Sequence, residues 1–537
     1  MKLNAKKNIL LVVLPNLPKG KTLKKSKFSR SSTFKAFPCG LLSIATYLKI
    51  KAGNKTDLQF LDCNLNEDGF ISELNKKLKQ FKPEVVAISM MFDNSYRHLK
   101  KISALIKKSN KKTVVVVGGI AATSSCATIL KEQKNVDGVC FYEGEIPLLN
   151  LVNSEKMLDF LENDISWVTR KSLREGRLPQ KSLIKNLDEV VNIDYSFVDV
   201  SNYAMREAFS PFADKIKQRK QFFLITSRGC PFNCVFCTHS GDKDKSMRYA
   251  SVEAVIKHVK FLVSKYGMNV LTIYDDQILL NKERAKEIFR RLAKFNLKIE
   301  VPSGLSVAFM DEELIGLMRK AGMDTVFLAI ESGSPYVLNE IIHKPLKIGM
   351  VKPVVQNLRK HGFWIQGFFV SGLPGERDEH RDETVKFIKE VGLDWSSFSL
   401  AAPLRGSDLF KICAENNYIQ KGIKIGEFDF NKFIINTAEY SADYVVKKTY
   451  LMNLDVNFVN NYRMKNKEYK IAADAFRNVA ARYPNHAFAY YYLSKALKVL
   501  KKEKESHKAM SKYKEILKND VSWREYAEYF NLIYNKQ

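Results

Sequence analysis

The stretch Phe222-Phe-Leu-Ile-Thr-Ser-Arg-Gly-Cys230-Pro-Phe-Asn-Cys234-Val-Phe-Cys237 runs from an apolar strand into a segment that holds three of the chain's eight cysteines. The cysteines follow the spacing C-x3-C-x2-C, and no fourth cysteine stands beside them. Thiolates bind iron–sulfur clusters, and a 4Fe-4S cube held by three of them leaves one iron open to another ligand. Gly229 and Pro231 help the backbone to turn here. The stretch therefore predicts a cluster site at the end of a strand.

An incomplete zinc site is the competing explanation for the same cysteines. A structural zinc ion usually takes four ligands in paired spacings. No second C-x2-C pair follows in the sequence. The spacing therefore favours an iron–sulfur cluster over zinc.

Apolar strands and amphipathic helices continue to alternate from this stretch to about residue 400. Strands are expected at residues 222–226, 270–274, 298–301, 325–330, 363–370 and 396–400. Helices are expected between them, for instance at residues 252–265, 282–295, 311–321 and 382–391. Six strand–helix units in succession predict a parallel βα barrel, complete or partial, with its chemistry at the carboxyl ends of the strands.

The first 150 residues show the same kind of alternation. Strands are expected at residues 8–14, 58–62, 85–89 and 113–119, and helices near residues 40–49, 68–81 and 95–109. Continuous β-branched runs separated by amphipathic helices are typical of a parallel sheet covered on both faces. We therefore predict a doubly wound, Rossmann-like α/β domain whose ligand sits at the carboxyl ends of its strands.

These patterns divide the chain into four parts. We expect a Rossmann-like domain at residues 1–165, a linker at 166–219, a partial βα barrel at 220–430 and a helical region at 431–537. The last region places small and aromatic residues, such as Ala472, Phe476 and Tyr490, at offsets that resemble the tetratricopeptide (TPR) repeat. At least three repeats are normally needed for a stable array, and fewer are visible here. TPR-like packing is therefore a hypothesis, whereas helix is the prediction.

The composition is that of a globular protein with an excess of basic residues. The 537 residues are 45% hydrophobic and 11% aromatic, and the formal net charge is +29. Apart from a dense run at residues 19–27, the lysines are scattered along the chain. Since no single face or arginine-rich motif carries the excess, the charge does not indicate a nucleic-acid partner.

The sequence also bears on location. It holds no uninterrupted run of about 18 apolar residues, which argues against a membrane span. The apolar run that ends at Leu14 is too short for a signal peptide and is expected to form a strand. The cysteines lack the regular spacing of a disulfide framework, so a reducing cytoplasm is the expected location.

The cysteine segment, with Phe236 before its last cysteine, resembles the signature of radical S-adenosylmethionine (SAM) enzymes. The residues from Thr226 to Cys234 resemble the subgroup with an N-terminal cobalamin-binding domain, and the resemblance covers roughly residues 8–410. It implies that Cys230, Cys234 and Cys237 hold a 4Fe-4S cluster whose open iron binds SAM. One electron then cleaves SAM to methionine and a 5′-deoxyadenosyl radical.

Two other strand ends match regions that contact SAM in this family. Asp275 and Asp276 follow the second barrel strand, where relatives carry paired aspartates that bind the methionyl group or the substrate. Glu331, Ser332 and Gly333 follow the fourth strand and match the ribose and methionyl contact region. Both segments also suit the start of a helix, so a capping role stays open. Glu376, after the fifth strand, is expected to reach a neighbouring backbone group rather than the substrate.

One departure from the family concerns the third strand. Many relatives carry an arginine and an aspartate after it, but the matching positions here hold Ser306 and Ala308. The carboxylate-anchoring role of that pair is therefore in doubt, and we consider Arg248 as a substitute.

Three segments of the first domain resemble the cobalamin-binding module. They are the helix-like residues 37–48, the strand ends at Ser89 and at Gly118 and Gly119, and the turn Glu143-Gly144-Glu145. The Asp-x-His-x-x-Gly motif, which supplies an axial histidine to cobalt, is absent after the first strand, where Pro15-Asn16-Leu-Pro18 stands. The resemblance therefore implies base-off cobalamin without a histidine ligand. A domain that keeps the fold but has lost cobalamin is the alternative.

The function implied by the resemblance is a cobalamin-dependent radical reaction, most simply methylation of an unactivated carbon in a small molecule or peptide. An electron donor such as flavodoxin or ferredoxin is also implied, and the helical tail is a candidate site for a protein partner. One alternative is a methylthiotransferase acting on tRNA, which needs a second cluster from cysteines such as Cys39, Cys63, Cys126 and Cys140. Another is a catalytically dead, TPR-type scaffold, against which the intact cysteine trio speaks.

Overall fold

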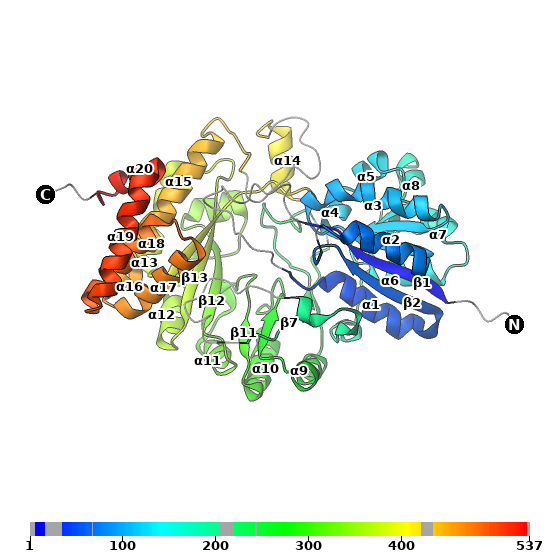
Figure 1. The fold of residues 1–537 in the computed structure, drawn as a ribbon, viewed down its shortest axis with the longest axis horizontal. Coiled ribbons are helices and arrows are strands. Elements are labelled where there is room, and N and C mark those ends of the chain that lie inside the picture. The colour runs from blue at the N-terminus through cyan, green and yellow to red at the C-terminus, as the bar shows by residue number, and fades with distance from the viewer. Residues whose placement is uncertain are drawn as a thin grey trace.

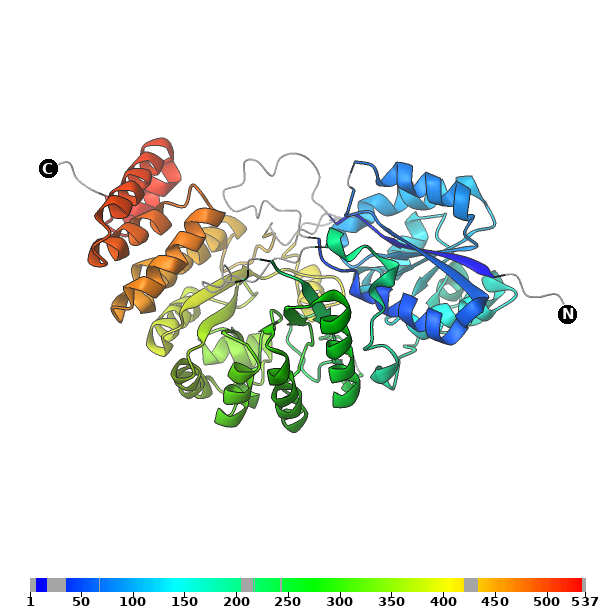
Figure 2. The same ribbon diagram turned by 60° about the horizontal axis from the view of Figure 1, so that its bottom comes forward.

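The computed structural model describes residues 6–16, 35–66, 68–203, 216, 218–241, 244–419 and 433–533. The chain folds into an N-terminal sheet covered by helices, a central half-ring of strands and helices, and a C-terminal group of helices (Figure 1). The half-ring lies between the other two parts, which Figure 2 shows from a second direction. The lysine-rich run at residues 19–27 lies outside the described residues.

The N-terminal sheet has six strands in the order β2-β1-β3-β4-β5-β6. They are β1 (Lys7–Val13), β2 (Thr56–Asp62), β3 (Val85–Ser89), β4 (Val114–Gly118), β5 (Gly138–Cys140) and β6 (Trp167–Val168). The first five are parallel, and β6 is antiparallel to β5. The strand order reverses between β1 and β3, which is where a doubly wound sheet binds its ligand.

Alternate side chains of β1 enter two separate cores, which explains its uninterrupted apolar sequence. Ile9 and Leu11 pack with Leu41 and Leu148, whereas Leu10 faces the opposite core. The helices are α1 (Cys39–Ala52), α2 (Phe70–Phe81), α3 (Tyr96–Ser109), α4 (Ile120–Ser124), α5 (Cys126–Glu132), α6 (Glu145–Asn153), α7 (Met157–Asn163) and α8 (Arg170–Arg174). The predicted doubly wound α/β domain is thus confirmed.

The sheet extends past the boundary expected from the sequence. Its sixth strand, β6, begins at Trp167, inside the segment that we expected to be a linker. A two-residue edge strand is too short to form a periodic pattern, so it could not be predicted from the sequence.

The central part is an open barrel of six parallel strands. One three-stranded sheet has the order β11-β10-β7 and the other β12-β13-β14. Their bounds are β7 (Gln221–Leu224), β10 (Val270–Ile273), β11 (Lys298–Glu300), β12 (Thr325–Glu331), β13 (Trp364–Ser371) and β14 (Trp395–Leu400). A bridge between Leu305 and Leu328 joins the two sheets. The six predicted strands are therefore all present, and the barrel is partial.

Helices cover the outside of this barrel (Figure 1). They are α9 (Val252–Tyr266), α10 (Lys282–Leu292), α11 (Glu312–Lys320), α12 (Val351–Lys360) and α13 (Asp378–Val391). A small hairpin of β8 (Ser227–Arg228) and β9 (Arg248–Tyr249) flanks the cysteine segment. Glu376 accepts a hydrogen bond from the backbone N–H of Gly372 at 2.6 Å, which confirms the backbone role expected from the sequence.

The C-terminal helices close the β14 edge of the barrel. They are α15 (Ala442–Leu454), the π-helix η12 (Asp455–Val459), α16 (Tyr462–Lys465), α17 (Tyr469–Arg482), α18 (Ala487–Val499), α19 (Glu503–Asn519) and α20 (Val521–Tyr529). The side-chain amide of Asn457 accepts a hydrogen bond from the N–H of Ser396 and donates one to the carbonyl of Ser396, both at 2.7 Å. One side chain thus pairs with an exposed strand edge, and the helical prediction is confirmed.

The β7 edge is closed from the other side of the molecule. Tyr195, in the segment between the two domains, donates a hydrogen bond to the carbonyl of Phe223 at 3.1 Å. Its ring packs with Phe37 and Phe222. The same segment is tied to α1, where Thr46 accepts a hydrogen bond from the N–H of Asp194 at 2.9 Å. Residues 194 and 195 therefore contact both the first domain and the barrel.

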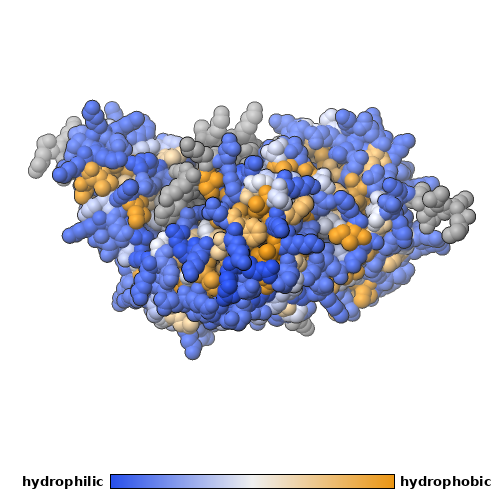
Figure 3. Space-filling model, turned by 90° about the horizontal axis from the view of Figure 1, so that it is seen from below, coloured by the Kyte–Doolittle hydropathy of each residue, from blue (hydrophilic) through white to orange (hydrophobic). Residues whose placement is uncertain are grey.

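Hydrophilic side chains cover most of the face seen in Figure 3, and apolar ones gather there in small groups. Within the described ranges, no helix is both long and apolar enough to cross a membrane.

Candidate active site

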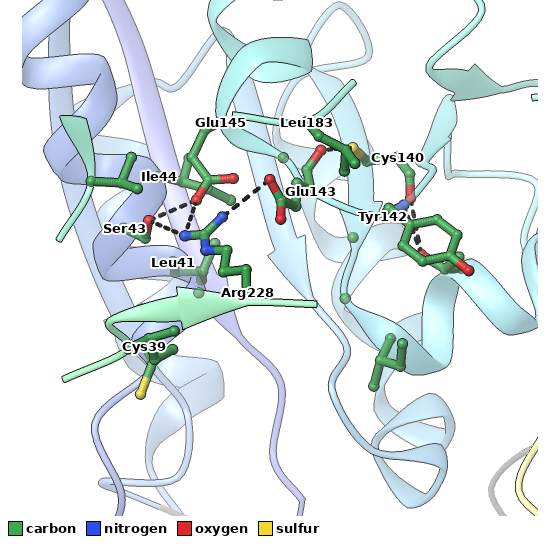
Figure 4. Close-up of a pocket in the computed structure, with 18 of the residues that line it drawn as sticks. Cys39, Leu41, Ser43, Ile44, Cys140, Tyr142, Glu143, Glu145, Leu183 and Arg228 are labelled. Carbon is green, nitrogen blue, oxygen red and sulfur yellow. Dashed lines mark hydrogen bonds and ion pairs between the residues drawn. The ribbon is translucent and has the colours of Figure 1, made fainter. Parts of the chain in front are cut away.

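A cavity of about 440 Å³ lies where the strand ends of the first domain meet the barrel. Its walls come from both domains, as the close-up in Figure 4 shows for part of the lining. The lining includes Ser43, Ser89, Gly118, Gly119, Glu143, Gly144 and Glu145 from the first domain, and Arg228, Cys230, His239, Tyr274 and Asp276 from the barrel. The structure therefore brings all the predicted site residues of the first domain into one space with two of the predicted barrel residues, Cys230 and Asp276.

The three predicted cluster cysteines lie on one loop after β8. Cys230, Cys234 and Cys237 are all half-buried, and the N–H of Cys237 donates to the carbonyl of Cys234 at 2.8 Å in a tight turn. Gly229 enters the loop with φ of 101°, and a Cβ there would lie 2.3 Å from the carbonyl oxygen of Ser246. Only glycine fits this approach.

The thiols lie close enough to influence one another electrostatically. Burial raises the pKa of Cys234 to about 11, and the neighbouring Cys237 and Cys230 add to the increase while Lys344 opposes it. Burial likewise raises the pKa of Cys230 and Cys237. Such thiols stay protonated until a metal binds, so metal binding would release protons.

The donor set fits a cluster better than a single ion. Among the described residues, no three His, Cys, Asp or Glu side chains form a group that could enclose one metal ion. A 4Fe-4S cube attaches its three thiolates to three different irons, so its ligands stand further apart than those of zinc. The three half-buried cysteines on one loop fit such a set of ligands.

The loop is anchored by Val235, between two of the cysteines. Its N–H donates to the carbonyl of Ile342 at 3.0 Å, at the end of the π-helix η10 (Val337–Ile342). The predicted aromatic residue Phe236 packs against an apolar cluster that includes Val337 and Leu338 of η10. Phe236 therefore has a packing role in the structure, and its predicted contact with SAM stays a proposal.

The two predicted aspartates differ in their surroundings. Asp275 is 1% exposed and accepts hydrogen bonds from the N–H of Thr226 at 2.5 Å, the hydroxyl of Thr226 at 2.6 Å and the hydroxyl of Ser227 at 2.7 Å. It therefore holds the chain that leads into the cysteine loop, and its predicted contact with the methionyl group or the substrate stays a proposal. Asp276 instead lines the cavity, and loss of hydration raises its pKa.

The segment after β12 is also divided between two roles. Ser332 and Gly333 are buried against α13, where Thr384 accepts a hydrogen bond from the N–H of Gly333 at 3.0 Å. A Cβ on Gly333 would lie 2.7 Å from the Cβ of Phe387. Ser332 and Gly333 thus pack against α13, and their predicted contact with SAM stays a proposal. Glu331 has a φ of 73° and pairs with Lys344.

Lys344 is a site residue that the sequence did not reveal. Its ammonium lies 3.0 Å from the carboxylate of Glu331, and its pKa is affected by Cys234 and Cys230. Although burial lowers it, the carboxylate and the thiols keep the pKa of Lys344 above its ordinary value. A charged ammonium therefore stands beside the cysteine trio. No motif marks it, because it lies 13 residues from Glu331 after an irregular helix.

The strand ends of the first domain form a tight backbone cradle. Ser89 and Gly118 are register partners at the ends of β3 and β4. Gly119 follows with φ of 107°, and a Cβ there would lie 2.6 Å from the carbonyl oxygen of Met90. These three residues line the cavity as expected, and the close approach explains the glycine at position 119.

Deeper in the first domain, the cavity becomes apolar. Ala87, Val116, Leu148 and Trp167 line it between the sheet and its covering helices. Trp167 is 2% exposed, and its indole N–H has no hydrogen-bond partner. An apolar slot with one orphaned donor suits a flat heterocycle with an acceptor atom, such as the nucleotide base of cobalamin.

Glu143 and Glu145 have partners that were not expected. Their carboxylates pair with Arg228 and Arg248 of the barrel. Both glutamates also line the cavity, and their predicted contact with cobalamin stays a proposal. The guanidinium of Arg248 donates to Glu143 and Ile184, which makes it less suited as a substitute anchor for the carboxylate of SAM. Gly144 lies between them, and a Cβ on it would meet Ile44 at 2.8 Å.

The cysteines considered for a second cluster sit mainly in cores. Cys63 and Cys140 are buried in the two cores of the N-terminal sheet, and burial raises the pKa of both thiols. Cys39 and Cys126 are half-buried. Their surroundings agree with the packing role of free cysteine.

Comparison with known proteins gave matches to both halves. Residues 224–388 match the model of the radical SAM superfamily, and residues 28–152 match that of the B12 binding domain. The chain is 30% identical to an uncharacterized methyltransferase of Pyrococcus horikoshii over 382 residues, which are 71% of this chain and 79% of the relative. It is also 30% identical over 413 residues to the cytidylyl-2-hydroxyethylphosphonate methyltransferase of Streptomyces wedmorensis, covering 71% of this chain and 75% of the relative.

The fold also resembles a solved structure over almost the whole chain. The cobalamin-dependent SAM radical enzyme OxsB, with aqua-cobalamin and SAM bound, superimposes with a TM-score of 0.63 at 15% identity. The match covers 99% of this chain and 82% of OxsB. At this identity the likeness concerns the fold.

Proposed function

The chain belongs to the radical SAM superfamily, in the group that carries a B12-binding domain, and from this membership we propose that it methylates a carbon atom of a small molecule or peptide. Two relatives at 30% identity are named methyltransferases, which supports methyl transfer over other radical chemistry. A 4Fe-4S cluster, SAM and cobalamin are its cofactors, as in the family.

One observation carries the proposal. The strand-end cradle of the first domain and the cysteine loop of the barrel open into the same cavity, with Gly118 on one wall and Cys230 on the other. A methyl donor and a radical generator must both reach one substrate, and a shared cavity allows this. A domain that had lost its cofactor would not need this cavity.

When bound, the cluster supplies the electron that cleaves SAM, and cobalamin supplies the methyl group. In this proposal the chain's own residues hold and orient these groups. Cys230, Cys234 and Cys237 bind the cluster, and Lys344 places a positive charge beside it. Asp276 is the carboxylate that faces the cavity and is available to bind the ammonium group of SAM or the substrate. The apolar slot at Trp167 excludes water from the first domain.

We further propose that cobalamin binds base-off, without histidine on cobalt. Asn16, after β1, stands where the histidine motif is expected, and its backbone N–H donates a hydrogen bond to the side-chain oxygen of Asn64 at 2.9 Å. His239 lines the cavity from the barrel side, where its charge acts on Asp276. Flavodoxin or ferredoxin would serve as the electron donor.

The test is anaerobic purification and reconstitution of the full chain, followed by metal analysis and reduction in the presence of SAM. We expect about four irons and one cobalt per chain, and formation of 5′-deoxyadenosine. About eight irons would favour a methylthiotransferase with two clusters. An intact cluster that never yields 5′-deoxyadenosine would favour the scaffold, and zinc at the cysteines would overturn the proposal.

A further inference from the structure

Arg228 connects the cysteine loop to the first domain. It lies two residues before Cys230, and its guanidinium points away from the barrel toward α1 and α6 (Figure 4). One nitrogen donates to the hydroxyl of Ser43 at 3.0 Å and to Glu145 at 2.8 Å. The other lies 3.2 Å from Glu143. Three side chains of the first domain therefore hold the residue that begins the cluster loop.

Arg248 makes a second connection beside the first. Arg228 and Arg248 are register partners in the β8–β9 hairpin, which encloses the cysteine segment. Arg248 donates to both oxygens of Glu143, at 2.6 and 3.0 Å, and to the carbonyl of Ile184 at 2.6 Å. Both ends of the cysteine segment are thus tied to one turn of the first domain.

The group is largely removed from water. The side chains of Arg228, Arg248 and Glu143 are 18%, 14% and 17% exposed, and that of Glu145 is 4% exposed. Burial opposes the charge of Glu145, but Arg228 and the hydroxyl of Ser43 outweigh it and hold the pKa of Glu145 below its ordinary value. A buried ion pair usually contributes little net stability compared with apolar packing, and its best-attested use is to fix one relative placement of two elements.

Both ends of the connection are stiff. On the barrel side, Gly229 packs against the carbonyl oxygen of Ser246, and on the other side Gly144 packs against Ile44. The same turn is also held from β5, because the thiol of Cys140 donates to the carbonyl of Glu143 at 3.4 Å. A shift of the cysteine loop therefore cannot occur without moving the turn at the end of β5.

We propose that Arg228, Arg248, Glu143 and Glu145 are positioning residues that set the distance between the cluster and the cobalamin-binding cradle. We call these four residues the arginine bridge. The inference rests on the proposed function, since it assumes that both cofactors bind to the walls of the shared cavity. Its consequence is that loosening the bridge changes the separation of the cofactors without removing either one.

The main measurement is electron paramagnetic resonance of the reconstituted, reduced full chain. In the wild-type protein we expect one well-defined spin–spin interaction between cobalt(II) and the reduced cluster. In Arg228→Gln and Arg248→Gln we expect that interaction to broaden or vanish, at unchanged iron and cobalt content. Unchanged spectra in both variants would overturn the inference.

Arg228→Lys and Arg359→Gln are the matched variants. Lysine keeps the charge but lacks the planar fork that serves several acceptors, so we expect an intermediate spectrum. Arg359 also pairs with a buried carboxylate, since its guanidinium lies 3.0 Å from Asp394, and its side chain is 21% exposed. It lies in the barrel and contacts the C-terminal region instead of the first domain. Its replacement should leave the spin–spin interaction as in the wild type.

Hydrogen exchange tests the bridge even if cobalamin does not bind. In Arg228→Gln we expect roughly tenfold faster exchange at residues 140–145 and also at 227–230, because one charged hydrogen-bond network holds both. Faster exchange on one side alone would show that the two segments are not linked and would overturn the inference. Absence of cobalt from the wild-type protein would count against the proposed function, and the exchange result would still judge the bridge.

Discussion

The two free edges of the open barrel are closed by opposite kinds of contact. At β14, the amide of Asn457 pairs with both backbone groups of Ser396, surrounded by the rings of Trp395 and Phe458. At β7, a single hydroxyl, that of Tyr195, reaches a strand carbonyl, and the nearby interface contains the arginine bridge and the cavity. Aromatic rings pack at both edges, whereas the cavity and the arginine bridge lie on the side of the β7 edge.

This difference indicates how stability and function are distributed. Apolar burial stabilises folding roughly in proportion to area, whereas buried charge costs hydration that ion pairing only partly returns. The tail edge therefore stabilises the barrel, and the first-domain edge is where a site with open space and charged groups is kept. The predictions that follow test this division, from the largest expected effect to the smallest.

Removing a cysteine should abolish chemistry without damaging the fold. In Cys234→Ala, we expect loss of the cluster and of 5′-deoxyadenosine formation, because one of the three ligands is gone. Thermal unfolding of the metal-free protein should stay near the wild-type value, since Cys234 is only half-buried. Iron analysis and calorimetry provide the measurement. Cys126→Ala, also half-buried but in the first domain, is the control and should keep its iron. Full activity of Cys234→Ala would refute the site.

Removing the side-chain amide of Asn457 should damage the fold without abolishing the chemistry. Asn457 is 1% exposed, and Asn457→Leu leaves the N–H and carbonyl of Ser396 without partners. We expect destabilisation of the barrel–tail contact by about 3 kcal/mol, because two buried backbone groups lose their hydrogen bonds. Denaturation followed by hydrogen exchange in β14 would measure it. Asn416→Leu, at an exposed helix end, is the control; equal effects in the two variants would contradict the edge role.

Lowering the pH should destabilise the C-terminal helices before it breaks the arginine bridge. Burial lowers the pKa of His486 from 6.5 to about 3, among the rings of Phe458 and Trp523. The unfolded chain binds a proton at His486 more readily than the folded chain does. The contribution of neutral His486 to the free energy of unfolding is therefore complete above pH 6.5 and declines as the pH falls toward 3. Between pH 7 and pH 5 we expect a loss of about 2 kcal/mol. Exchange rates in α18, corrected for pH, would measure it. In His486→Asn this pH dependence should disappear, and its persistence would show that another group is responsible.

The smallest effect is expected at the β7 edge. Tyr195→Phe removes one hydroxyl and leaves the carbonyl of Phe223 without that donor, while the ring contacts with Phe37 and Phe222 remain. We expect a loss of about 1 kcal/mol in the free energy of unfolding, from one buried hydrogen bond. Chemical denaturation would measure it, with Tyr336→Phe on the surface as control. A loss as large as that of Asn457→Leu would remove the proposed contrast between the edges.

The sequence predicted the strands because their signals are local. Runs such as Val114 to Val117 and the glycines after them carry both the strand and its turn in neighbouring residues. The cysteine trio was found for the same reason. The arginine bridge was not, since Arg228 and its acceptor Glu145 are 83 residues apart and their pairing depends on how two domains dock.

Asp275 shows a different limit of sequence reasoning. Its type and place at a strand end suit ligand binding, but Thr226 and Ser227, 48 or more residues away in sequence, donate three hydrogen bonds to its carboxylate. Asp276, one residue later, points into the cavity because side chains alternate along an extended chain. From the sequence, Asp275 and Asp276 are equally good candidates for binding a ligand, and only the packing of the fold distinguishes them.

Among the described residues, the barrel shares no strand with the N-terminal sheet, and at each of its borders a side chain, Tyr195 or Asn457, hydrogen-bonds to the strand backbone. A neighbour attached in this way can be exchanged during evolution without rebuilding a hydrogen-bonded ladder. Gene fusion at either border then needs only a few compatible residues, which makes the half-ring a reusable unit to which new cofactor modules and new tails can be joined.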